Sequence, residues 1–463
     1  MKDRPDTGTT GKALPAAGGP SLAEAFGAFV AATRFEALPA AVTEAAKLRI
    51  LDVLGAALAA YGRARHAQLL PLLTSQGATN AWGLRDRLAL RDAILLNSFL
   101  SHALYLEDGS RFSGGHPSSV VIPCAIAFAE AQGASGRDLI AAVVVGYDVF
   151  LRLGRAIYPS TVRRGFQSTS VAGAAASAAA AAHLLRHDPG QARNALAIAA
   201  TLGVGLIAAS TSSGSQPLQV ARSCEGGALA ALFAGQGAVG AGGIIEDGFL
   251  QAFSDAAPAI DMLAGLGSDF RILETYLKMH GGCRGNHAPV DVVQALRLRH
   301  GFDAAEIASL RIAIDSVTDR IAIHEPANGT QAQYCVAFAV AAALANGDAS
   351  IAQYTDAMLQ APHIRALMER IQVAVDPALD HGYPDRRGAH AEVVLRDGRR
   401  FRGAIDNARG EPEQPFAASE VERKFFTLAR DVLPLGGRRV RDLVMDLESL
   451  DDVGTLAAAL SSP

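Results

Sequence analysis

Apolar residues recur at helical spacing through the first half of the chain, from about Ser21 to Asp269. Glycine, proline and serine separate these segments, and strict alternation of apolar and polar residues is almost absent. Leu38–Tyr61 and Ser135–Gly154 follow the i, i+3, i+4 pattern of amphipathic helices. Ala172–Leu185 is dominated by alanine and lacks a polar face, which predicts a buried helix packed closely on its neighbours. We expect this half to be all helical.

The pattern changes after about Arg271, where apolar and polar residues begin to alternate as they do in half-buried strands. The expected strands are Ser309–Asp315, Ile371–Val375, Ala389–Leu395 and Arg399–Ile405. Asp397 and Gly398 join the last two, and this pair predicts a hairpin turn in which both residues tolerate φ > 0. A second, mixed α+β domain is therefore expected to begin near residue 272.

Helical spacing returns in the tail of the chain, from Phe416 to Leu460. Glu420–Leu433 and Leu450–Leu460 are the candidate helices, with Ser449 as the expected N-cap of the second. We expect this tail to pack back on the first domain.

The distribution of charged and apolar residues argues against a nucleic-acid partner and against a membrane span. The 463 residues are enough for two domains, and half of them are hydrophobic, as in a globular protein. The 42 basic residues are scattered among 46 acidic ones, so no basic face for nucleic acid is predicted. The longest apolar stretches, such as Val171–Leu185, are shorter than the roughly 18–20 residues that span a bilayer, so no membrane segment is expected.

The cysteines and the first residues favour a reducing compartment. Cys124, Cys224, Cys283 and Cys335 lie far apart without a CxxC pair, which argues against a zinc site, an iron–sulfur cluster and a disulfide framework. Residues 1–20 lack the apolar core of a signal peptide and predict a disordered lead. We expect a cytoplasmic protein without a metal site.

Polar residues gather in four stretches that are rich in glycine or serine. Because loops held by rigid helices commonly carry binding groups, we expect the functional site there. The stretches are His102–Ser119, Arg163–Ser170, Gly214–Arg222 and Lys278–Asp291.

Several motifs occur in an order that resembles a known family. They are LDVLGAALAA near residue 51, NSFLSHALYLEDG followed by HPSSVVIP, RRGFQSTSVAGAAASAAAAAHLL, and KMHGGCRGNHAPVD. Together they resemble the MmgE/PrpD proteins along essentially the whole chain after residue 20. That family includes 2-methylcitrate dehydratase, cis-aconitate decarboxylase and iminodisuccinate epimerase.

The resemblance implies a mainly α fold with an α+β part, usually found as a homodimer. A large helical domain would comprise residues 21–271 and 413–463, with a smaller α+β lid, residues 272–412, inserted between them. The cleft between them would bind a small carboxylate, without a metal or an organic cofactor. Removal of a proton next to the carboxylate needs a base, an acid, and donors or cations that hold the developing charge.

Two residues match the family's catalytic positions. His116 corresponds to the histidine of the HPS segment, where it lies beside the substrate and exchanges protons near neutral pH. The alternative is a histidine that only caps the helix after it. Lys278 opens the KxxxxCRxxH segment, where a lysine at a domain junction binds carboxylate or acts as a base. The alternative is an exposed lysine on a lid strand.

The rest of that segment supplies candidate substrate contacts. Cys283 corresponds to a position that faces the cleft in many relatives, although a buried, inert thiol is an equal alternative. Arg284 would pair a substrate carboxylate or bridge the domains, and His287 follows it. His102 and Arg164, from two of the other polar stretches, complete the predicted binding residues.

This chain departs from the family's pattern at several positions. Tyr105 stands at the first aspartate of the DxDD-type box, of which Glu107 and Asp108 retain the last two acidic positions. Gln167 replaces a common histidine, and Gln216 a common lysine. Glutamine forms hydrogen bonds but neither holds a charge nor titrates, so a less anionic substrate or simpler proton chemistry is expected. Tyr105, with an ordinary pKa near about 10, would be a better acid than base.

Two classes of function remain open. The first is a lyase or isomerase that uses His116, Lys278 and Tyr105 on a small organic acid. The second is a homologue that has lost catalysis and serves as a binding or scaffold protein, which the neutral replacements permit. A nucleotide site at Gly237–Gly243 has little support, because its glycines do not form GxGxxG after a predicted strand.

Overall fold

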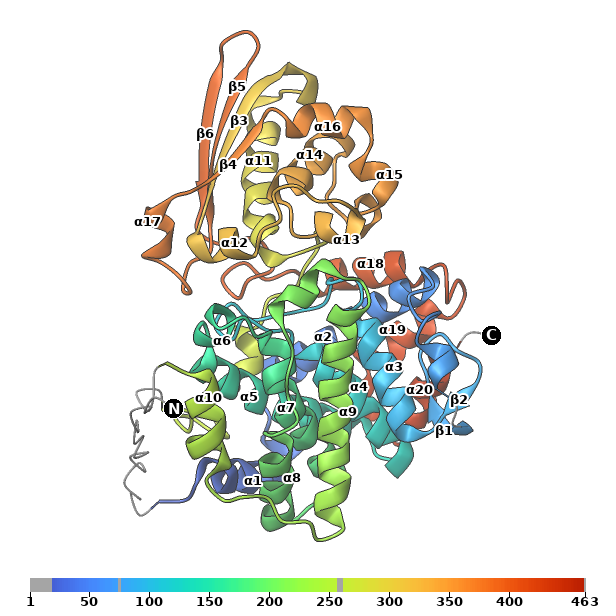
Figure 1. The fold of residues 1–463 in the computed structure, drawn as a ribbon. Helices are drawn as coiled ribbons and strands as arrows, with labels where there is room; N and C mark the ends of the chain where they lie inside the picture. The colour runs from blue at the N-terminus through green and yellow to red at the C-terminus, as the bar shows by residue number, and fades with distance from the viewer. Residues whose placement is uncertain (1–18, 74–75, 256–260, 462–463) are drawn as a thin grey trace, which may run out of the picture.

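The computed structural model describes residues 19–73, 76–255 and 261–461. The predicted disordered lead, residues 1–20, therefore lies outside the described residues except for Gly19 and Pro20. The structure has a helical domain below a smaller lid that carries a four-stranded sheet (Figure 1). The prediction of a mainly α fold with an α+β part is confirmed. Within the described residues, no helix is long and apolar enough to cross a membrane.

Helices from both ends of the chain build the lower domain. Its helices are α1 (Leu22–Ala32), α2 (Ala40–Gly62), α3 (Leu90–His102), α4 (Ser118–Gln132), α5 (Gly136–Ile157), α6 (Ser160–Arg163), α7 (Ser168–Leu184), α8 (Pro189–Ala199), α9 (Ser215–Gly235), α10 (Gln251–Phe253), α18 (Ala418–Ala429), α19 (Gly437–Met445) and α20 (Gly454–Ala459). Of the three that follow the lid, α18 and α19 pack on α2.

The centre of this domain is α7, whose residues are all buried. It packs against α4, α5, α8 and α9, as its uniform small side chains predict. The approach to α9 is close enough to require glycine, because a Cβ added at Gly227 would lie 2.2 Å from the carbonyl oxygen of Ala174. This rigid centre supports the ends of α7 and α9, where Gln167 and Gln216 lie.

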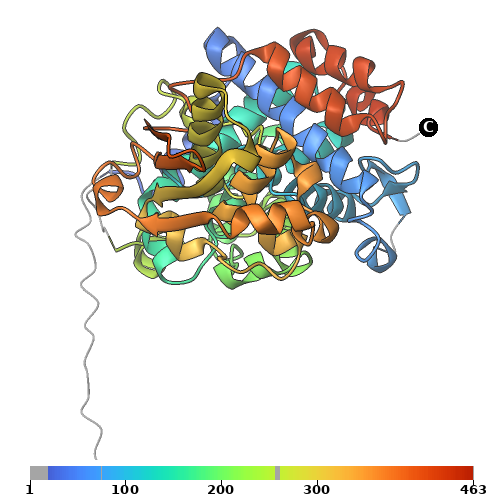
Figure 2. The same cartoon turned by 90° about the horizontal axis from the view of Figure 1, so that it is seen from above.

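The lid is an α+β layer structure. Its helices are α11 (His287–His300), α12 (Ser316–Ile321), α13 (Gly329–Ala332), α14 (Val336–Asn346), α15 (Asp356–Leu359), α16 (Pro362–Met368) and α17 (Pro377–Asp380), and its strands are β3 (Ile307–Ile314), β4 (Ile371–Val375), β5 (Ala389–Leu395) and β6 (Arg400–Ile405). The strand order is β4-β3-β5-β6; β3 and β4 are parallel, and β5 is antiparallel to both of its neighbours. Helices α11 and α14 pack against this sheet. Seen from above, the lid lies in front of the helical domain (Figure 2).

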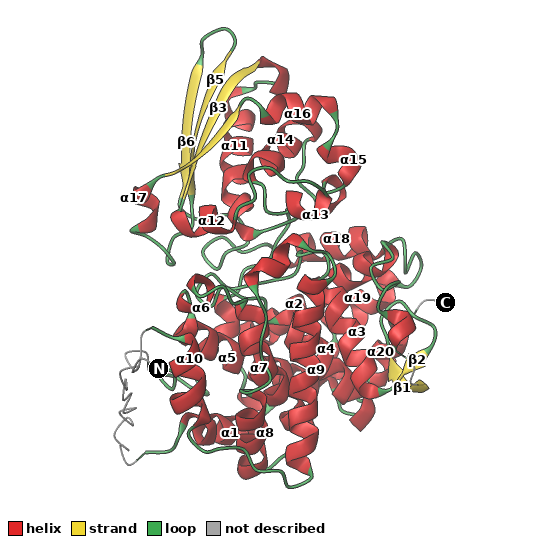
Figure 3. Cartoon of the chain, viewed as in Figure 1, coloured by secondary structure: helices red, strands yellow, loops and turns green. Residues whose placement is uncertain are grey.

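Three local predictions are wrong. The first half contains a small antiparallel sheet, β1 (Gln76–Asn80) with β2 (Arg87–Leu88), whose strands are too short to show alternation (Figure 3). In the β5–β6 hairpin only Gly398 has a positive φ, 90°, because Leu395 N–H donates to Arg399 O and closes a three-residue loop. Ser449 caps no helix: it ends a short 3₁₀ turn, and α20 begins four residues beyond the predicted start.

Candidate active site

One loop of the helical domain carries most of the candidate site. Residues 103–117 connect the end of α3 to the start of α4, and Tyr105, Glu107, Asp108 and His116 all lie in it. The N–H of His116 donates to Thr169 Oγ1 at 3.1 Å, which attaches the loop to the first turn of α7. We call residues 103–117 the site loop.

His102, the last residue of α3, is hydrogen-bonded on both ring nitrogens. Its Nδ1 lies 2.5 Å from Glu107 Oε1, and both side chains are fully buried. Its Nε2 is approached by the amide groups of Gln167 and Gln216, at 3.3 and 3.4 Å. Gln167 Oε1 accepts from the N–H and hydroxyl of Ser170, so its amide nitrogen is the atom turned towards His102. Because an amide nitrogen only donates, these contacts make His102 Nε2 the acceptor and Nδ1 the donor to Glu107.

His116 has a different arrangement. Its Nδ1 lies 2.5 Å from the carbonyl oxygen of Asp108, an atom that only accepts, so Nδ1 carries the proton. Burial, together with the neighbouring Lys278 ammonium, lowers the pKa of His116 to about 3. This lowered pKa favours the neutral ring at pH 7, and Nε2, which has no hydrogen-bond partner among the described residues, keeps a lone pair that can accept a proton.

Glu107 and Asp108 are neighbours with opposite pKa shifts. Burial alone would raise the pKa of Glu107, but the hydrogen bond from His102 Nδ1 and the nearby Lys278 ammonium lower it to about 2. Burial raises the pKa of Asp108 to about 6, although Asp108 accepts hydrogen bonds from Ser118 and from Tyr147, the latter at 2.8 Å. Glu107 is therefore ionised at neutral pH and lies within the site, whereas Asp108 stabilises the loop through its hydrogen bonds with Ser118 and Tyr147.

Lys278 brings a positive charge to the site from the segment that enters the lid. Its Nζ donates to the carbonyl oxygen of Tyr105 at 2.8 Å and lies 4.6 Å from the centre of the Tyr105 ring. The residue is fully buried, which excludes the alternative of an exposed lid lysine. Burial lowers the pKa of Lys278 to about 8, although the Glu107 carboxylate favours the ammonium form. The ammonium can therefore bind a carboxylate at neutral pH.

Tyrosines surround the histidine pair. The Tyr105 ring lies 5.1 Å from His102, 4.9 Å from His116 and 5.3 Å from Tyr334, measured between ring centres. Burial raises the pKa of both tyrosines, so both hydroxyls keep their protons. Cys283 packs against these two tyrosines and is itself buried.

Tyr334 is a site residue that the sequence did not reveal. It precedes α14 in the lid, and its hydroxyl accepts a hydrogen bond from the Gln216 amide at 3.2 Å. Its sequence neighbours, Gln333 and Cys335, form no recognised motif. A polar aromatic residue immediately before an apolar helix was the only signal.

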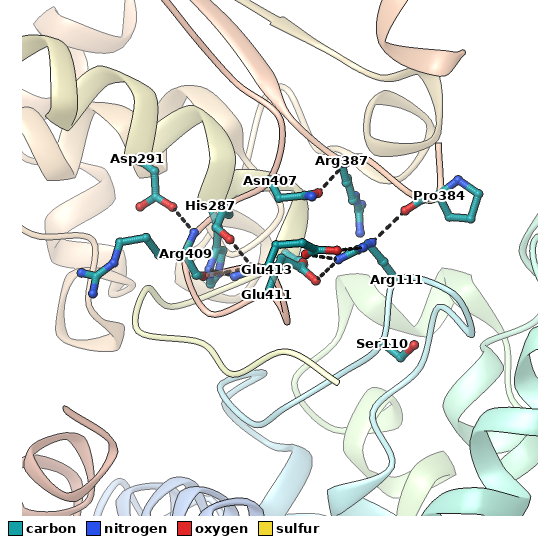
Figure 4. A network of polar contacts seen from close by, with 12 residues as sticks. Ser110, Arg111, His287, Asp291, Pro384, Arg387, Asn407, Arg409, Glu411 and Glu413 are labelled. Carbon is teal, nitrogen blue, oxygen red and sulfur yellow. Dashed lines mark hydrogen bonds and ion pairs between the residues drawn. The ribbon is translucent and has the colours of Figure 1, made fainter. Parts of the chain in front are cut away.

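Arg284 and His287 lie at the domain junction and face one another. Arg284 Nε donates to Glu411 Oε1 at 3.0 Å, and its terminal nitrogens donate to the carbonyl oxygens of Ala408 and Arg409 and to His287. Arg111 of the site loop donates to Glu411 and Glu413 (Figure 4). These partners of Arg284 all lie within residues 272–412, the predicted lid, whereas Arg111 joins the site loop to the same glutamate, Glu411.

Arg164 lies outside this cluster. Its guanidinium pairs with Asp255 at 2.6 Å and donates to backbone carbonyl groups of residues 252 and 254. About a third of the side chain is exposed. The structure thus brings together His102, Tyr105, Glu107, His116, Gln167, Gln216, Lys278 and Cys283, with Asp108, Arg284 and His287 around them and Arg164 elsewhere.

The described residues contain no group of three or more His, Cys, Asp or Glu side chains that could hold a metal ion.

Comparisons with known proteins agree with the resemblance. The sequence profile of the MmgE/PrpD N-terminal domain matches residues 24–260, and that of the C-terminal domain matches residues 280–449. Cis-aconitate decarboxylase of Aspergillus terreus is 27% identical over 92% of this chain and 93% of its own length. The cis-aconitate decarboxylase-like protein oryM of Aspergillus oryzae is 26% identical over 92% of this chain and 94% of its own, and human cis-aconitate decarboxylase is 26% identical over 96% and 95%. The chain belongs to the MmgE/PrpD family.

Proposed function

We propose that the protein is a cofactor-independent lyase or isomerase that removes a proton next to a carboxylate or carbonyl of a small organic acid. The observation that carries this proposal is the neutral His116, whose Nε2 is free while Nδ1–H is bonded to Asp108 O, beside the buried Lys278. A free imidazole lone pair next to an ammonium group is a base beside a carboxylate-binding cation. Its relatives' activity on cis-aconitate supports chemistry of the lyase class.

The roles of the site residues follow from their hydrogen bonds. Lys278 would hold the substrate carboxylate, and this negative charge would offset the ammonium that depresses the pKa of His116. His116 Nε2 would then take the α-proton, leaving an enolate-like anion next to Lys278. Tyr105 and Tyr334, which keep their protons, would donate to an oxygen of this anion or to a leaving group.

The substrate we propose is less anionic than cis-aconitate. Gln167 and Gln216 present amides, and both already point towards His102. Among the residues gathered around the two histidines, Lys278 brings the positive charge and Glu107 a permanent negative one. A second or third substrate carboxylate would meet neutral donors there, which stabilise it less than a cation does.

Substrate entry requires the lid to move. His102, Glu107 and Lys278 are fully buried, and Tyr334 and Cys283 cover the Tyr105 ring from the lid side. We therefore interpret this structure as the closed form, in which water is excluded from the reacting groups.

Deuterium exchange tests the proposal without knowledge of the final product. The purified protein is incubated in deuterated water with a panel of mono-, di- and tricarboxylic acids, and α-proton exchange is followed by NMR. We expect exchange for at least one acid, and loss of exchange in His116→Ala and Lys278→Ala variants that remain folded. No exchange with any acid, together with tight binding of one of them, would instead support the binding or scaffold alternative.

A further inference from the structure

The site loop is attached to both segments that cross between the two parts of the chain. Gly109 and Tyr276, on the segment that enters the lid, exchange two backbone hydrogen bonds of 3.1 and 2.8 Å. Arg111 of the same loop binds Glu411 and Glu413, on the segment that returns. The conformation of this loop therefore depends on residues that lie far along the chain.

A buried lysine from the C-terminal helix α18 makes another such attachment. Lys424 Nζ donates to the carbonyl oxygen of Leu106 at 2.9 Å and to Asp52 Oδ1 at 2.6 Å. Only 8% of Lys424 and 2% of Asp52 are exposed. Asp52 belongs to α2, so the lysine is held between two helices and directed at the loop.

The carbonyl that Lys424 holds lies between two site residues. Tyr105 has φ of 55°, which is uncommon for a residue with a large side chain and requires support from its surroundings. Lys278 binds the carbonyl oxygen of Tyr105, and Lys424 binds the next one, of Leu106. Two ammonium groups thus hold consecutive carbonyl oxygens, and the side chains of Tyr105 and Glu107 are left to face the histidines.

We propose that Lys424, oriented by Asp52, is a positioning residue that fixes Tyr105 and Glu107 against His102 and His116. It contacts neither histidine and acts only through the loop. This inference deepens the proposed function, since the geometry it maintains is that of the base and its acid partner. The competing interpretation is that Lys424 merely joins α18 to α2.

Lys47 provides a matched control for that interpretation. Like Lys424 of α18 it is a buried lysine, 3% exposed, but it belongs to α2 and joins that helix to the C-terminal segment. Its Nζ donates to Met445 O at 3.0 Å and to Glu448 at 3.1 Å, without a bond to the site loop. Loss of Lys47 therefore removes an attachment of the tail and leaves the loop as it is.

The test uses the full-length protein and avoids an unpaired buried carboxylate. Asp52→Asn combined with Lys424→Met removes both charges and the donor to Leu106 O. Asp52→Asn combined with Lys424→Gln removes the charges but keeps a donor. Lys47→Met is the control. We measure the kcat and KM of α-proton exchange, and amide hydrogen exchange of residues 103–112 without substrate.

The expected result separates positioning from general stability. The methionine double variant should lower kcat about 100-fold, the loss typical of a misplacement of about 1 Å, with KM changed less than about 3-fold. The site loop of this variant should also exchange amide hydrogens faster than in the wild type. The glutamine double variant should recover at least half of the loss of kcat on a logarithmic scale. Lys47→Met should match the wild type in both measurements. Unchanged loop exchange in the methionine variant, or an equal effect of Lys47→Met, would overturn the inference. If the wild-type protein exchanges no α-proton, the proposed function fails, and loop exchange alone still decides the role of Lys424.

Discussion

The two histidines of the site differ in how their ring nitrogens are used. His102 lies at the end of a helix, with Glu107 on one nitrogen and two glutamine amides on the other. His116 lies in a loop, with a carbonyl oxygen on Nδ1 and, among the described residues, no hydrogen-bond donor on Nε2. Two buried histidines with ring centres 5.5 Å apart are thus suited to different tasks, His102 to orientation and His116 to proton transfer.

The largest expected effect distinguishes the two histidines directly. His116→Asn keeps an amide donor near the Nδ1 position but removes Nε2, so α-proton exchange should fall by about 1,000-fold, as for loss of a general base. His102→Asn keeps a donor towards Glu107, so its rate of α-proton exchange should fall at least about ten-fold less than that of His116→Asn. Rates come from NMR in deuterated water, with folding checked by circular dichroism. Equal losses in the two variants would contradict the division of tasks.

Lys278 should give the next largest effect, on substrate affinity. Its ammonium form binds the carboxylate, so KM should rise as pH increases through about 8, the pKa of Lys278. Lys278→Met should raise KM by about 100-fold, which corresponds to loss of a charged hydrogen bond. In the variant, KM should no longer depend on pH between 7 and about 9. Persistence of that pH dependence would assign it to another group.

A cation at residue 216 should alter the substrate preference. Gln216→Lys places an ammonium group next to His102, so the ratio of activity on cis-aconitate to that on a monocarboxylate should rise about ten-fold. Gln219→Lys is the control, because Gln219 lies on the same helix but bonds to the backbone of Leu206. A gain in both variants would indicate a general effect of charge rather than a contact within the site.

Much of the fold follows from the hydrophobic pattern. The uniform alanine face of residues 172–185 predicted the central helix, and alternation located β4 and β5 at their observed bounds. The small sheet escaped prediction because its strands, of five and two residues, are too short to show alternation. The start of α20 was missed because it depends on a distant contact, the hydrogen bond from Val453 N–H to Ala134 O.

The site was only partly predictable. Motif positions identified His116, Lys278 and Tyr105, which the structure brings together. Tyr334 and Lys424 could not be found from the sequence, because each reaches the site loop or its neighbours from a segment more than 100 residues away. The lowered pKa of His116 could not be predicted from the sequence either, since it results from burial beside Lys278.

The adjacent carboxylates should give opposite pH profiles of stability. The pKa of Asp108 is raised to about 6 from an unfolded value near about 3.9, so its contribution is present below pH 4 and lost as pH rises through 6. The melting temperature of Asp108→Asn relative to wild type should therefore rise by about 2 °C between pH 4 and 7. Glu107→Gln is the counterpart. The pKa of Glu107 is lowered to about 2, so the ionised carboxylate stabilises the folded protein, and the melting temperature of Glu107→Gln relative to wild type should fall as pH rises from 3 to 5. Parallel profiles for the two variants would contradict these shifts.

The smallest effect is expected at Arg164, the predicted site residue that lies apart from both histidines. The side chains of its ion pair with Asp255 are 35% and 49% exposed, and ion pairs at the surface contribute about 0–1 kcal/mol to stability. Arg164→Ala should therefore leave kcat/KM within about two-fold of wild type, since no hydrogen bond connects Arg164 to the site loop in the described residues.

Arg111→Ala is the informative contrast, because Arg111 belongs to that loop and binds two glutamates of the returning segment. Steady-state kinetics of both variants would show whether charge in this region acts through the site loop. A loss at Arg164 comparable to that at Arg111 would place Arg164 itself in the path of the substrate.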